Sequence, residues 1–398
     1  MPDSDHRSSP AAGELRYRRI VAKFGTNLLT AGSERLDLTV MASLVGQVAA
    51  LRAAGAQILI VTSGAIAAGR HRLGGRRIGK EAPQRQMLAA VGQSRLMQAY
   101  DELFAWHSLV IAQTLLTRRD LADRQGYLNA RNTLLGLLDL GVIPIINEND
   151  VVAIEEIGER TIGDNDTLSA LVANLVDADL LAILTDIGGL YTRDPRRDGD
   201  ASLIPRVERV DEHIERLAGA AGTARGRGGM LTKVRAAALA TASGVDVVIA
   251  DGRSPHVLPE LACGGQLGTL FPATAPRAEG RRRFLLADVT VRGRVVVDEG
   301  ARRALVAEGR SLLPAGVRNV SGNFERGDAI DICGEDGVRI ARGITNYAAP
   351  DIEHIMGMRS DRLSEVLGHD YGSEVVHRNN LVLLTNRGEE YGTRAARR

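Results

Sequence analysis

The stretch VIPIINEND, residues 142–150, joins an apolar half to a polar half. The apolar half, residues 142–146, has the length and composition of a buried strand, and the polar residues follow at its carboxyl end. A second polar cluster, GDND at residues 163–166, precedes residues 167–173, whose spacing predicts an amphipathic helix. Because ligands in an open α/β sheet bind outside the carboxyl ends of the strands, the two clusters indicate a site at one edge of such a sheet.

Helix capping is the simpler interpretation of the second cluster. Asp164 or Asn165 can cap the helix that follows, while Asn149 and Asp150 can form a turn. Capping needs a single residue of this kind, and several occur together here. A ligand site therefore accounts for more of the cluster than capping alone.

The alternation of strands and helices extends over most of the chain. The segment at residues 57–61 is almost wholly apolar, which is typical of strands that are covered on both faces. Such alternation predicts the α/β class, with a mostly parallel sheet sandwiched by helices. The predicted strands are residues 17–24, 57–61, 109–116, 142–146, 179–184 and 245–250, with helices between them.

The longest predicted helix spans about residues 84–106. Its apolar residues recur at helical spacing, which predicts one face that packs against the rest of the protein. We expect Met87, Val91, Leu96 and Leu103 on that face.

The character of the sequence changes after residue 272. A segment rich in Pro, Ala and Arg is typical of a linker, and short β-rich pieces at close spacing follow it. These pieces predict a second, small and mostly β domain. The predicted organisation is a disordered tail at 1–15, a first domain at 16–272, a linker at 273–283, a second domain at 284–383 and a disordered tail at 384–398.

Composition excludes several classes of protein. The 398 residues are 44% hydrophobic and carry a net charge of +1, so no bulk field favours nucleic acid or a membrane. The two cysteines, Cys263 and Cys333, form neither a metal motif nor a disulfide framework, which predicts a reducing, cytoplasmic location. We expect neither a signal peptide nor a membrane span, because the N-terminus is polar and no long apolar run occurs.

Lysine is rare in this chain. Only three of the 50 cationic residues are lysines, namely Lys23, Lys80 and Lys233, which hints at sites that need a compact ammonium group. The segment that ends at Lys80, residues 74–80, nearly spells a P-loop. Glu81 stands where a Ser or Thr would meet magnesium, and no buried strand leads into the segment. We therefore predict an exposed basic loop there.

Several strands end in residues suited to bind phosphate. Lys23 and Gly25 follow the first strand, Ser63 and Gly64 follow the second, and Lys233 begins a helix behind a Gly-rich loop. Glycine lets the backbone approach a phosphate, and lysine neutralises its charge. An ordinary strand-to-helix turn accounts for the Ser63 segment equally well when it is considered alone. Together, these residues indicate phosphoryl transfer without a Walker motif.

The motifs of the chain, taken in order, resemble those of the amino acid kinase family, and within it the glutamate 5-kinases, which carry a C-terminal PUA domain. The resemblance covers residues 16–383. It rests on KFGT at 23–26, VTSGAI at 61–66, NEND at 147–150, GDND at 163–166, GLYT at 189–192, GGM at 228–230 with Lys233, VDEGA at 297–301 and SLLP at 311–314.

The resemblance implies an activity. It implies ATP-dependent phosphorylation of the side-chain carboxylate of L-glutamate to L-glutamyl 5-phosphate, the first step of proline biosynthesis, with ATP and Mg²⁺ as cofactors. It also implies feedback inhibition by proline and a homo-oligomer, either a dimer or a tetramer. γ-Glutamyl phosphate reductase is the implied functional partner.

The resemblance also implies roles for individual residues. For catalysis these are Lys23, Lys233 and Asp166, and for glutamate Ser63, Asp150 and Asn165, with Asn147 and Asp164 lining the same pocket. For the nucleotide they are Lys23, Thr185, Asp186, Arg227, Gly228, Gly229, Met230, Leu231, Thr232 and Lys233. Asp164 and Asp166 are the implied metal residues. Arg227 departs from the family, which usually has a small residue at that point of the nucleotide loop.

Two rival functions need to be weighed. One is a catalytically silent kinase fold that binds RNA or regulates through its PUA domain. Residues 284–369 hold 11 arginines against 13 acidic residues, and RNA binding normally needs a basic surface, so we predict no RNA binding. The other rival is a sister kinase for aspartate, acetylglutamate, carbamate or UMP. The lysines and aspartates that catalysis needs are all present, which favours an active glutamate kinase.

Overall fold

The structure, a computed structural model, describes residues 14–74, 76, 78–79, 81–153, 165–220, 229–275, 291–369 and 371–384. Lys80, most of both predicted tails and the linker from residue 276 onward lie outside the described residues. The chain divides into two compact units, the first comprising Met1–Leu121 and Ala130–Ala275 and the second Ala122–Asn129 and Pro276–Arg398. Among the described helices, none has the length and hydropathy needed to cross a bilayer.

The first unit is built on a seven-stranded sheet in the order β3-β4-β2-β1-β5-β6-β7. All neighbouring strands are parallel except β6 and β7, which are antiparallel, so the predicted mostly parallel sheet is confirmed. The strands are β1 (Arg19–Phe24), β2 (Gln57–Val61), β3 (Ile111–Leu116), β4 (Ile143–Glu148), β5 (Leu180–Thr185), β6 (Asp246–Asp251) and β7 (Thr269–Phe271).

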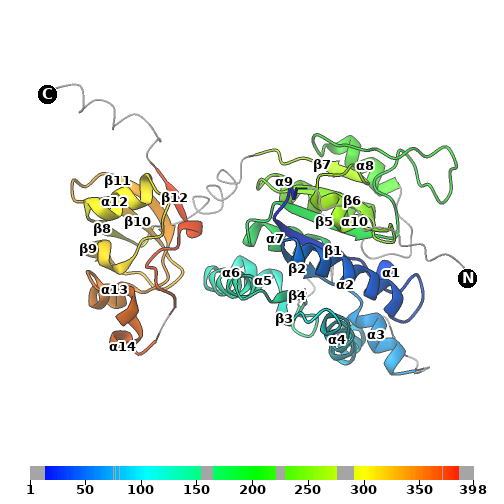
Figure 1. Ribbon diagram of the computed structural model, residues 1–398, viewed down its shortest axis with the longest axis horizontal. Coiled ribbons are helices and arrows are strands. Elements are labelled where there is room, and N and C mark those ends of the chain that lie inside the picture. The colour runs from blue at the N-terminus through cyan, green and yellow to red at the C-terminus, as the bar shows by residue number, and fades with distance from the viewer. Residues whose placement is uncertain are drawn as a thin grey trace, which may run out of the picture. The chain divides into compact units, whose positions relative to one another are not determined.

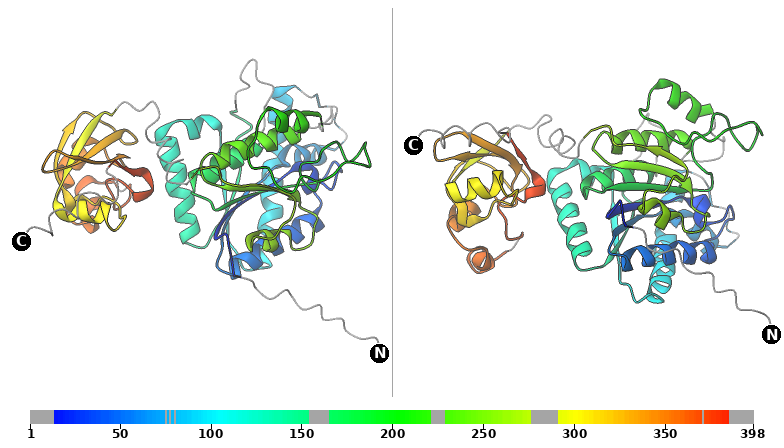
Figure 2. Two further views of the ribbon diagram at one scale, coloured as in Figure 1. Left: turned by 90° about the horizontal axis from the view of Figure 1, so that it is seen from above. Right: turned by 45° about the horizontal axis from the view of Figure 1, so that its top comes forward.

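Helices cover both faces of this sheet (Figures 1 and 2). On one face lie α2 (Leu38–Ala53), α4 (Ala82–Ala105) and α10 (Val257–Ala262), whose apolar residues form one core with the strands. On the other face α7 (Asn165–Leu175) packs on β1 and α9 (Met230–Thr241) packs on β6. The remaining helices are α1 (Thr26–Leu29), α3 (Ala65–Arg72), α5 (Arg118–Ala122), α6 (Arg124–Asp139) and α8 (Glu212–Ala220).

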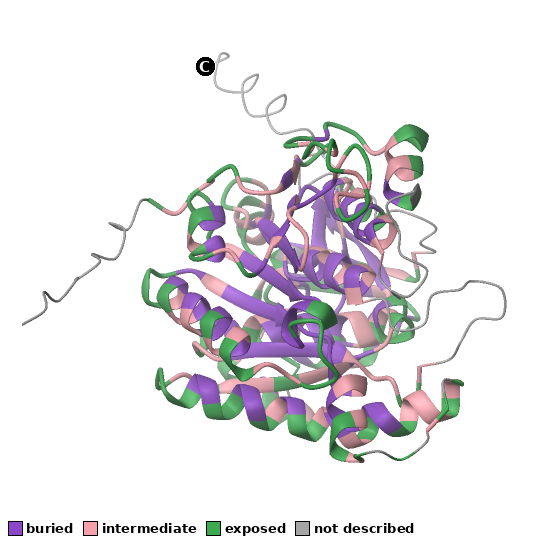
Figure 3. Ribbon diagram, turned by 90° about the vertical axis from the view of Figure 1, so that its right-hand side faces the viewer, coloured by how far each residue is buried: buried purple, intermediate pink, exposed green. Residues whose placement is uncertain are grey.

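The side chains of β1 point alternately to the two faces of the sheet. Ile20, Ala22 and Phe24 are fully buried in the core beneath α2. Because neighbouring residues of a strand point to opposite faces, Lys23 lies on the face that carries α7 and α9. Figure 3 shows most of the strands in purple, between helices that also carry exposed residues in green. A lysine in this position enters a protein interior rather than solvent.

The apolar face of α4 is shifted from the predicted one. Leu96 and Leu103 are buried as expected, but Met87 is 60% exposed, and its prediction is wrong. The buried line of α4 runs instead through Leu88 and Gly92. A glycine adds nothing to an apolar pattern, so the face that it lies on cannot be read from hydrophobic periodicity alone.

Gly92 lies at a very close contact between α4 and α3. A Cβ atom at Gly92 would lie 1.8 Å from the carbonyl oxygen of Ala65, and one at Gly69 would lie 1.9 Å from that of Leu88. Both neighbours are backbone atoms, so the two helices would have to separate to admit a methyl group. The pair of glycines therefore lets α4 approach α3 closely, next to Ser63 and Gly64 at the start of α3.

We expect Gly92→Ala to lower the free energy of unfolding by about 2 kcal/mol, in the range of overpacked cores. Urea denaturation followed by circular dichroism measures the change. Gly136→Ala in α6 is the matched control, since no atom of the described residues lies within 4 Å of its added Cβ and alanine favours helix by about 0.5–1 kcal/mol. Equal stability of the two variants would contradict the close packing.

The second unit contains a five-stranded sheet in the order β12-β11-β10-β8-β9, which confirms the small, mostly β domain. Its core includes the fully buried Phe324 and Tyr347. No disulfide joins Cys263 and Cys333. The strands are β8 (Gly293–Val297), β9 (Val317–Gly322), β10 (Ala329–Gly334), β11 (Arg339–Ile344) and β12 (Leu381–Leu383). The helices are α12 (Glu299–Val306), α13 (Ala349–Ile355) and α14 (Leu363–Leu367), with single turns at Pro314–Gly316, Ser360–Arg362 and Arg378–Asn380.

Candidate active site

The candidate site lies at the carboxyl edge of the seven-stranded sheet. Because β4, β2, β1 and β5 are adjacent and parallel, their carboxyl ends meet at one edge. Lys23 and Thr185 lie at the ends of β1 and β5, Asn147 lies at the end of β4, and Ser63 follows β2. The chain passes from β4 across to β5 on the other side of β1, and such a change of direction is where open α/β sheets bind ligands.

Two lysines hold one aspartate in the interior of the site. Lys23 Nζ lies 2.5 Å from Asp166 Oδ1, and Lys233 Nζ lies 3.1 Å from Asp166 Oδ2. The hydroxyl of Thr232 donates a hydrogen bond of 2.7 Å to the same Oδ2 atom. All three charged residues are at most 5% exposed, although they come from β1, α7 and α9. The two lysines that the sequence singled out therefore meet at one carboxylate.

The electrostatics of this cluster favour an anion. Burial by itself would raise the pKa of Asp166, but the charges of Lys23 and Lys233 and the hydrogen bonds from Lys23 and Thr232 hold it well below its usual range. Asp166 is therefore ionised at neutral pH. The cluster brings two ammonium groups to one carboxylate. Ammonium groups held in a site that excludes water attract phosphate strongly.

Asp166 fits the role of orienting the lysines better than the role of a metal ligand. Both of its oxygens face ammonium or hydroxyl donors, and a metal ion there would lie against two positive charges. Among the described residues, no three His, Cys, Asp or Glu side chains are grouped to hold a metal. Asp164, the other implied metal residue, lies outside the described part of the chain. The donor set thus suits Mg²⁺ that arrives on phosphate oxygens with its own water.

Three of the residues implied for glutamate lie together beside this cluster. Asn165 Nδ2, at the start of α7, donates hydrogen bonds of 3.1 Å to Ser63 Oγ and of 3.1 Å to Asn147 Oδ1. Asn147 Nδ2 in turn donates a 2.8 Å bond to Oε1 of Gln93, a residue of α4 that no sequence pattern had singled out. A continuous chain of polar side chains therefore crosses the edge of the sheet.

Asp150 is half-buried just beyond β4. Burial raises its pKa to about 6, and the nearby charge of Arg85 opposes the rise only in part. Burial disfavours the ionised form of this carboxylate, and a cationic partner would stabilise that form. This environment suits a substrate ammonium group.

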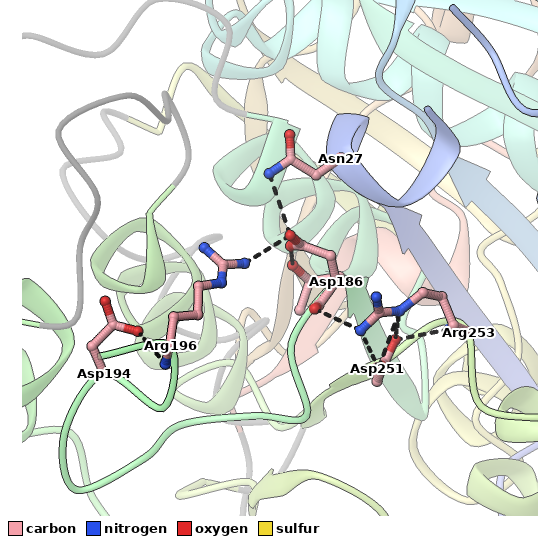
Figure 4. Close-up of polar contacts among 7 residues, drawn as sticks. Asn27, Asp186, Asp194, Arg196, Asp251 and Arg253 are labelled. Carbon is pink, nitrogen blue, oxygen red and sulfur yellow. Dashed lines mark hydrogen bonds and ion pairs between the residues drawn. The ribbon is translucent and has the colours of Figure 1, made fainter. Parts of the chain in front are cut away.

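The ends of β5 and β6 carry a separate group of charges (Figure 4). Asp186 accepts a 2.7 Å bond from Arg196 Nη2 and a 3.4 Å bond from Asn27, while its backbone carbonyl accepts a 2.9 Å bond from Arg253. Arg253 also binds both carboxylate oxygens of Asp251. The sequence pointed to Asp186 but missed Arg196 and Arg253, because nothing distinguishes two arginines in a chain that is rich in them.

The start of α9 completes the implied nucleotide loop. Gly229 directly precedes the helix without a side-chain cap, and a Cβ atom there would meet no described residue within 4 Å. Backbone N–H groups at a helix start without a side-chain cap suit an anion. Met230 and Leu231 follow in the first turn, and Thr232 points to Asp166 instead. Arg227 and Gly228 lie outside the described residues.

Comparison with known families agrees with this geometry. The model of the amino acid kinase family matches residues 18–251, and the model of the PUA domain matches residues 293–367. A solved UMP kinase structure from Bacillus anthracis aligns with a TM-score of 0.45 and 14% identity, over 65% of this chain and 97% of that chain. At that similarity the alignment says nothing about the substrate.

Curated relatives are far more similar and match over their full length. Glutamate 5-kinase of Dehalococcoides mccartyi strain CBDB1 is 51% identical over 92% of this chain and 99% of that protein. Those of Herpetosiphon aurantiacus and Deinococcus radiodurans are 50% and 49% identical, over 92% of this chain and 98% and 100% of theirs. The chain therefore belongs to the amino acid kinase family, in the branch of its glutamate 5-kinase relatives.

Proposed function

We propose that this chain transfers the γ-phosphoryl group of ATP to the side-chain carboxylate of L-glutamate, which yields L-glutamyl 5-phosphate and ADP and begins proline biosynthesis. The observation that carries the proposal is the buried cluster of Lys23, Asp166 and Lys233, in which two ammonium groups contact one carboxylate. It lies between the polar side chains implied for glutamate and the loop implied for the nucleotide.

The chemistry asks for charge neutralisation rather than for a base. The glutamate side chain has a pKa of about 4.3 and is already ionised at neutral pH. Its oxygen forms a bond to the γ-phosphorus, while the bond from that phosphorus to the bridging oxygen breaks and ADP leaves with the electron pair. Two anions must approach each other, and Lys23 and Lys233 offset their repulsion. Mg²⁺ would add to this by neutralising the phosphates that it accompanies.

Polar side chains would hold the amino acid in line with the nucleotide. Asn165 is already hydrogen-bonded to both Ser63 and Asn147, so little side-chain freedom remains to be lost when the substrate binds. Asp150 would pair with the substrate ammonium group. The Asp186 group at the ends of β5 and β6 would meet the nucleotide.

A single assay tests the proposal. The protein is incubated with MgATP and hydroxylamine, and the hydroxamate formed from the acyl phosphate is measured with glutamate, aspartate, acetylglutamate and carbamate in turn, with ADP release measured in parallel for UMP. We expect glutamate to give by far the highest kcat/KM. The absence of hydroxamate with glutamate would refute the activity, and a preference for another acceptor would refute the substrate.

The pH dependence of substrate binding tests the role of Asp150. Its raised pKa means that the carboxylate, and any pairing with an ammonium group, is present above about pH 6 and lost as the pH falls through that value. The KM for glutamate should therefore rise up to about tenfold for each pH unit below 6, because glutamate itself stays largely ionised there. In Asp150→Asn the KM should be high and nearly independent of pH between 5 and 8. Matching pH profiles of the two proteins would contradict this role.

Further features of the proposal rest on the family resemblance. They are feedback inhibition by proline, assembly into a dimer or a tetramer, a cytoplasmic location and transfer of the labile product to γ-glutamyl phosphate reductase. Catalysis belongs to the kinase domain, residues 16–272. The PUA domain, residues 284–383, has a structural or regulatory role in this proposal rather than RNA binding.

A further inference from the structure

One backbone group fixes the orientation of three side-chain amides, of which Asn147 is buried and Gln93 and Asn165 are partly buried. The N–H of Glu148 donates a 2.9 Å bond to Asn147 Oδ1, and a backbone N–H is a donor in any arrangement. Asn147 must therefore present its oxygen to Glu148 and its nitrogen to Gln93. Since that nitrogen is also a donor, Gln93 must meet it with Oε1, at 2.8 Å.

The same argument applies on the other side of Asn147. Its oxygen also accepts a 3.1 Å bond from Asn165, so Asn165 must offer its nitrogen there. Two atoms then point away from the chain of amides, Nε2 of Gln93 and Oδ1 of Asn165. Both are buried, and neither has a hydrogen-bond partner among the described residues.

An unpaired buried polar atom costs about 1–3 kcal/mol, so native proteins rarely keep one without a reason. Here the two atoms have opposite character. Gln93 Nε2 can donate to a carboxylate, and Asn165 Oδ1 can accept from an ammonium group. An α-amino acid carries one group of each kind on a single carbon.

The direction of the amide chain indicates which of the two carboxylates of glutamate meets Gln93. Asn165 adjoins Asp166 in α7, so its end of the row of amides lies beside the lysines, where the reacting carboxylate would bind. Gln93 is at the opposite end, on α4. The carboxylate that meets Gln93 is therefore the one that does not react.

We propose that Gln93 is a substrate-binding residue whose Nε2 group donates to the α-carboxylate of glutamate, while Oδ1 of Asn165 accepts from the α-ammonium group. This inference rests on the proposed function and adds to it the residue that recognises the non-reacting carboxylate.

Gln93→Glu is the decisive variant. It keeps an oxygen for the bond from Asn147 and replaces only the donor, which becomes a second anionic oxygen. The KM for glutamate should rise at least about 100-fold, as expected when a hydrogen bond to a charged group is lost and repulsion replaces it. The kcat and the KM for ATP should change less than threefold. In isoglutamine the α-carboxylate is replaced by an amide, while the side-chain carboxylate is intact. The KM for isoglutamine should therefore rise much less between the wild type and Gln93→Glu.

Gln98→Glu is the matched control, because Gln98 is an exposed residue of the same helix, bonded to Arg95 and Glu102. It should keep the KM of the wild type for both substrates. If Gln93→Glu does not fold, the wild type alone tests the idea, since its KM for isoglutamine should exceed that for glutamate by about 100-fold or more.

The outcomes separate this inference from the proposed function. If the wild type forms no acyl phosphate from glutamate, the proposed function fails. If the wild type does form acyl phosphate, two results with Gln93→Glu overturn the assignment of Gln93. One is an unchanged KM for glutamate, and the other is an equal rise in the KM for glutamate and for isoglutamine. A wild type that does not discriminate between the two substrates overturns it as well.

Discussion

Lys233→Ala should lose at least about 1000-fold in kcat while it remains folded. Lys233 supplies one of two buried ammonium groups beside Asp166, and its removal takes away one of the positive charges that offset the repulsion between glutamate and ATP. Loss of one well-placed donor costs about 100–1000-fold in other enzymes, and a full charge in a site without water is worth more. Hydroxamate formation at saturating substrates measures kcat, and circular dichroism reports the fold.

Two further variants serve as controls for Lys233→Ala. Arg235→Ala removes a cation from the same helix, but the Arg235 side chain is 61% exposed and pairs with Glu215 at the surface, so kcat should stay within twofold. Lys233→Arg keeps the positive charge on a planar and longer group. Its kcat should remain close to that of Lys233→Ala, since the two cations are not interchangeable in a tight site. Near-normal turnover of a folded Lys233→Ala protein would remove Lys233 from the mechanism.

Asp166→Asn should affect stability as well as turnover. The variant keeps the shape of the side chain but removes the buried carboxylate charge that both Lys23 and Lys233 contact. Removing one partner of a buried charged group typically costs about 3–5 kcal/mol, and we expect a loss of that size in the free energy of unfolding at pH 7. Turnover should fall with it, because the lysines are no longer held in place.

Urea denaturation of Asp166→Asn measures the stability, and hydroxamate formation measures the turnover. Asp198→Asn is the control, because it breaks the exposed pair with Arg193, and exposed pairs contribute little. An Asp166→Asn protein as stable as the wild type would mean that the lysines do not depend on the carboxylate. Activity retained without it would exclude the orienting role.

The sequence predicted the sheet because parallel, doubly covered strands are apolar throughout. Residues 57–61 and 179–184 needed no tertiary information to be recognised, and β2 (Gln57–Val61) and β5 (Leu180–Thr185) match them closely. The polar ends of the strands could be predicted too, since ligands of open α/β sheets bind at the carboxyl ends of apolar strands. Lys23 and Lys233 stood out because lysine is so rare in this chain.

The contacts that depend on close packing could not be predicted. Met87 was placed on the wrong face of α4 because the buried line passes through Gly92, which has no side chain to reveal it. Gln93, the next residue, looks like any surface glutamine in the sequence. Its position beside Asn147 follows from how closely α4 approaches α3 and the sheet, and no local pattern records that distance.

The convergence of β1, α7 and α9 on one carboxylate has a consequence for how the protein is made. Lys23, Asp166 and Lys233 come from distant parts of the chain, and joining distant segments is slow because loop entropy is lost first. During synthesis, Asp166 has at most one of its two counter-charges until residue 233 has been added. The catalytic cluster therefore assembles only after nearly the whole first unit exists, and recovery of activity on refolding should report completion of that unit rather than its first collapse.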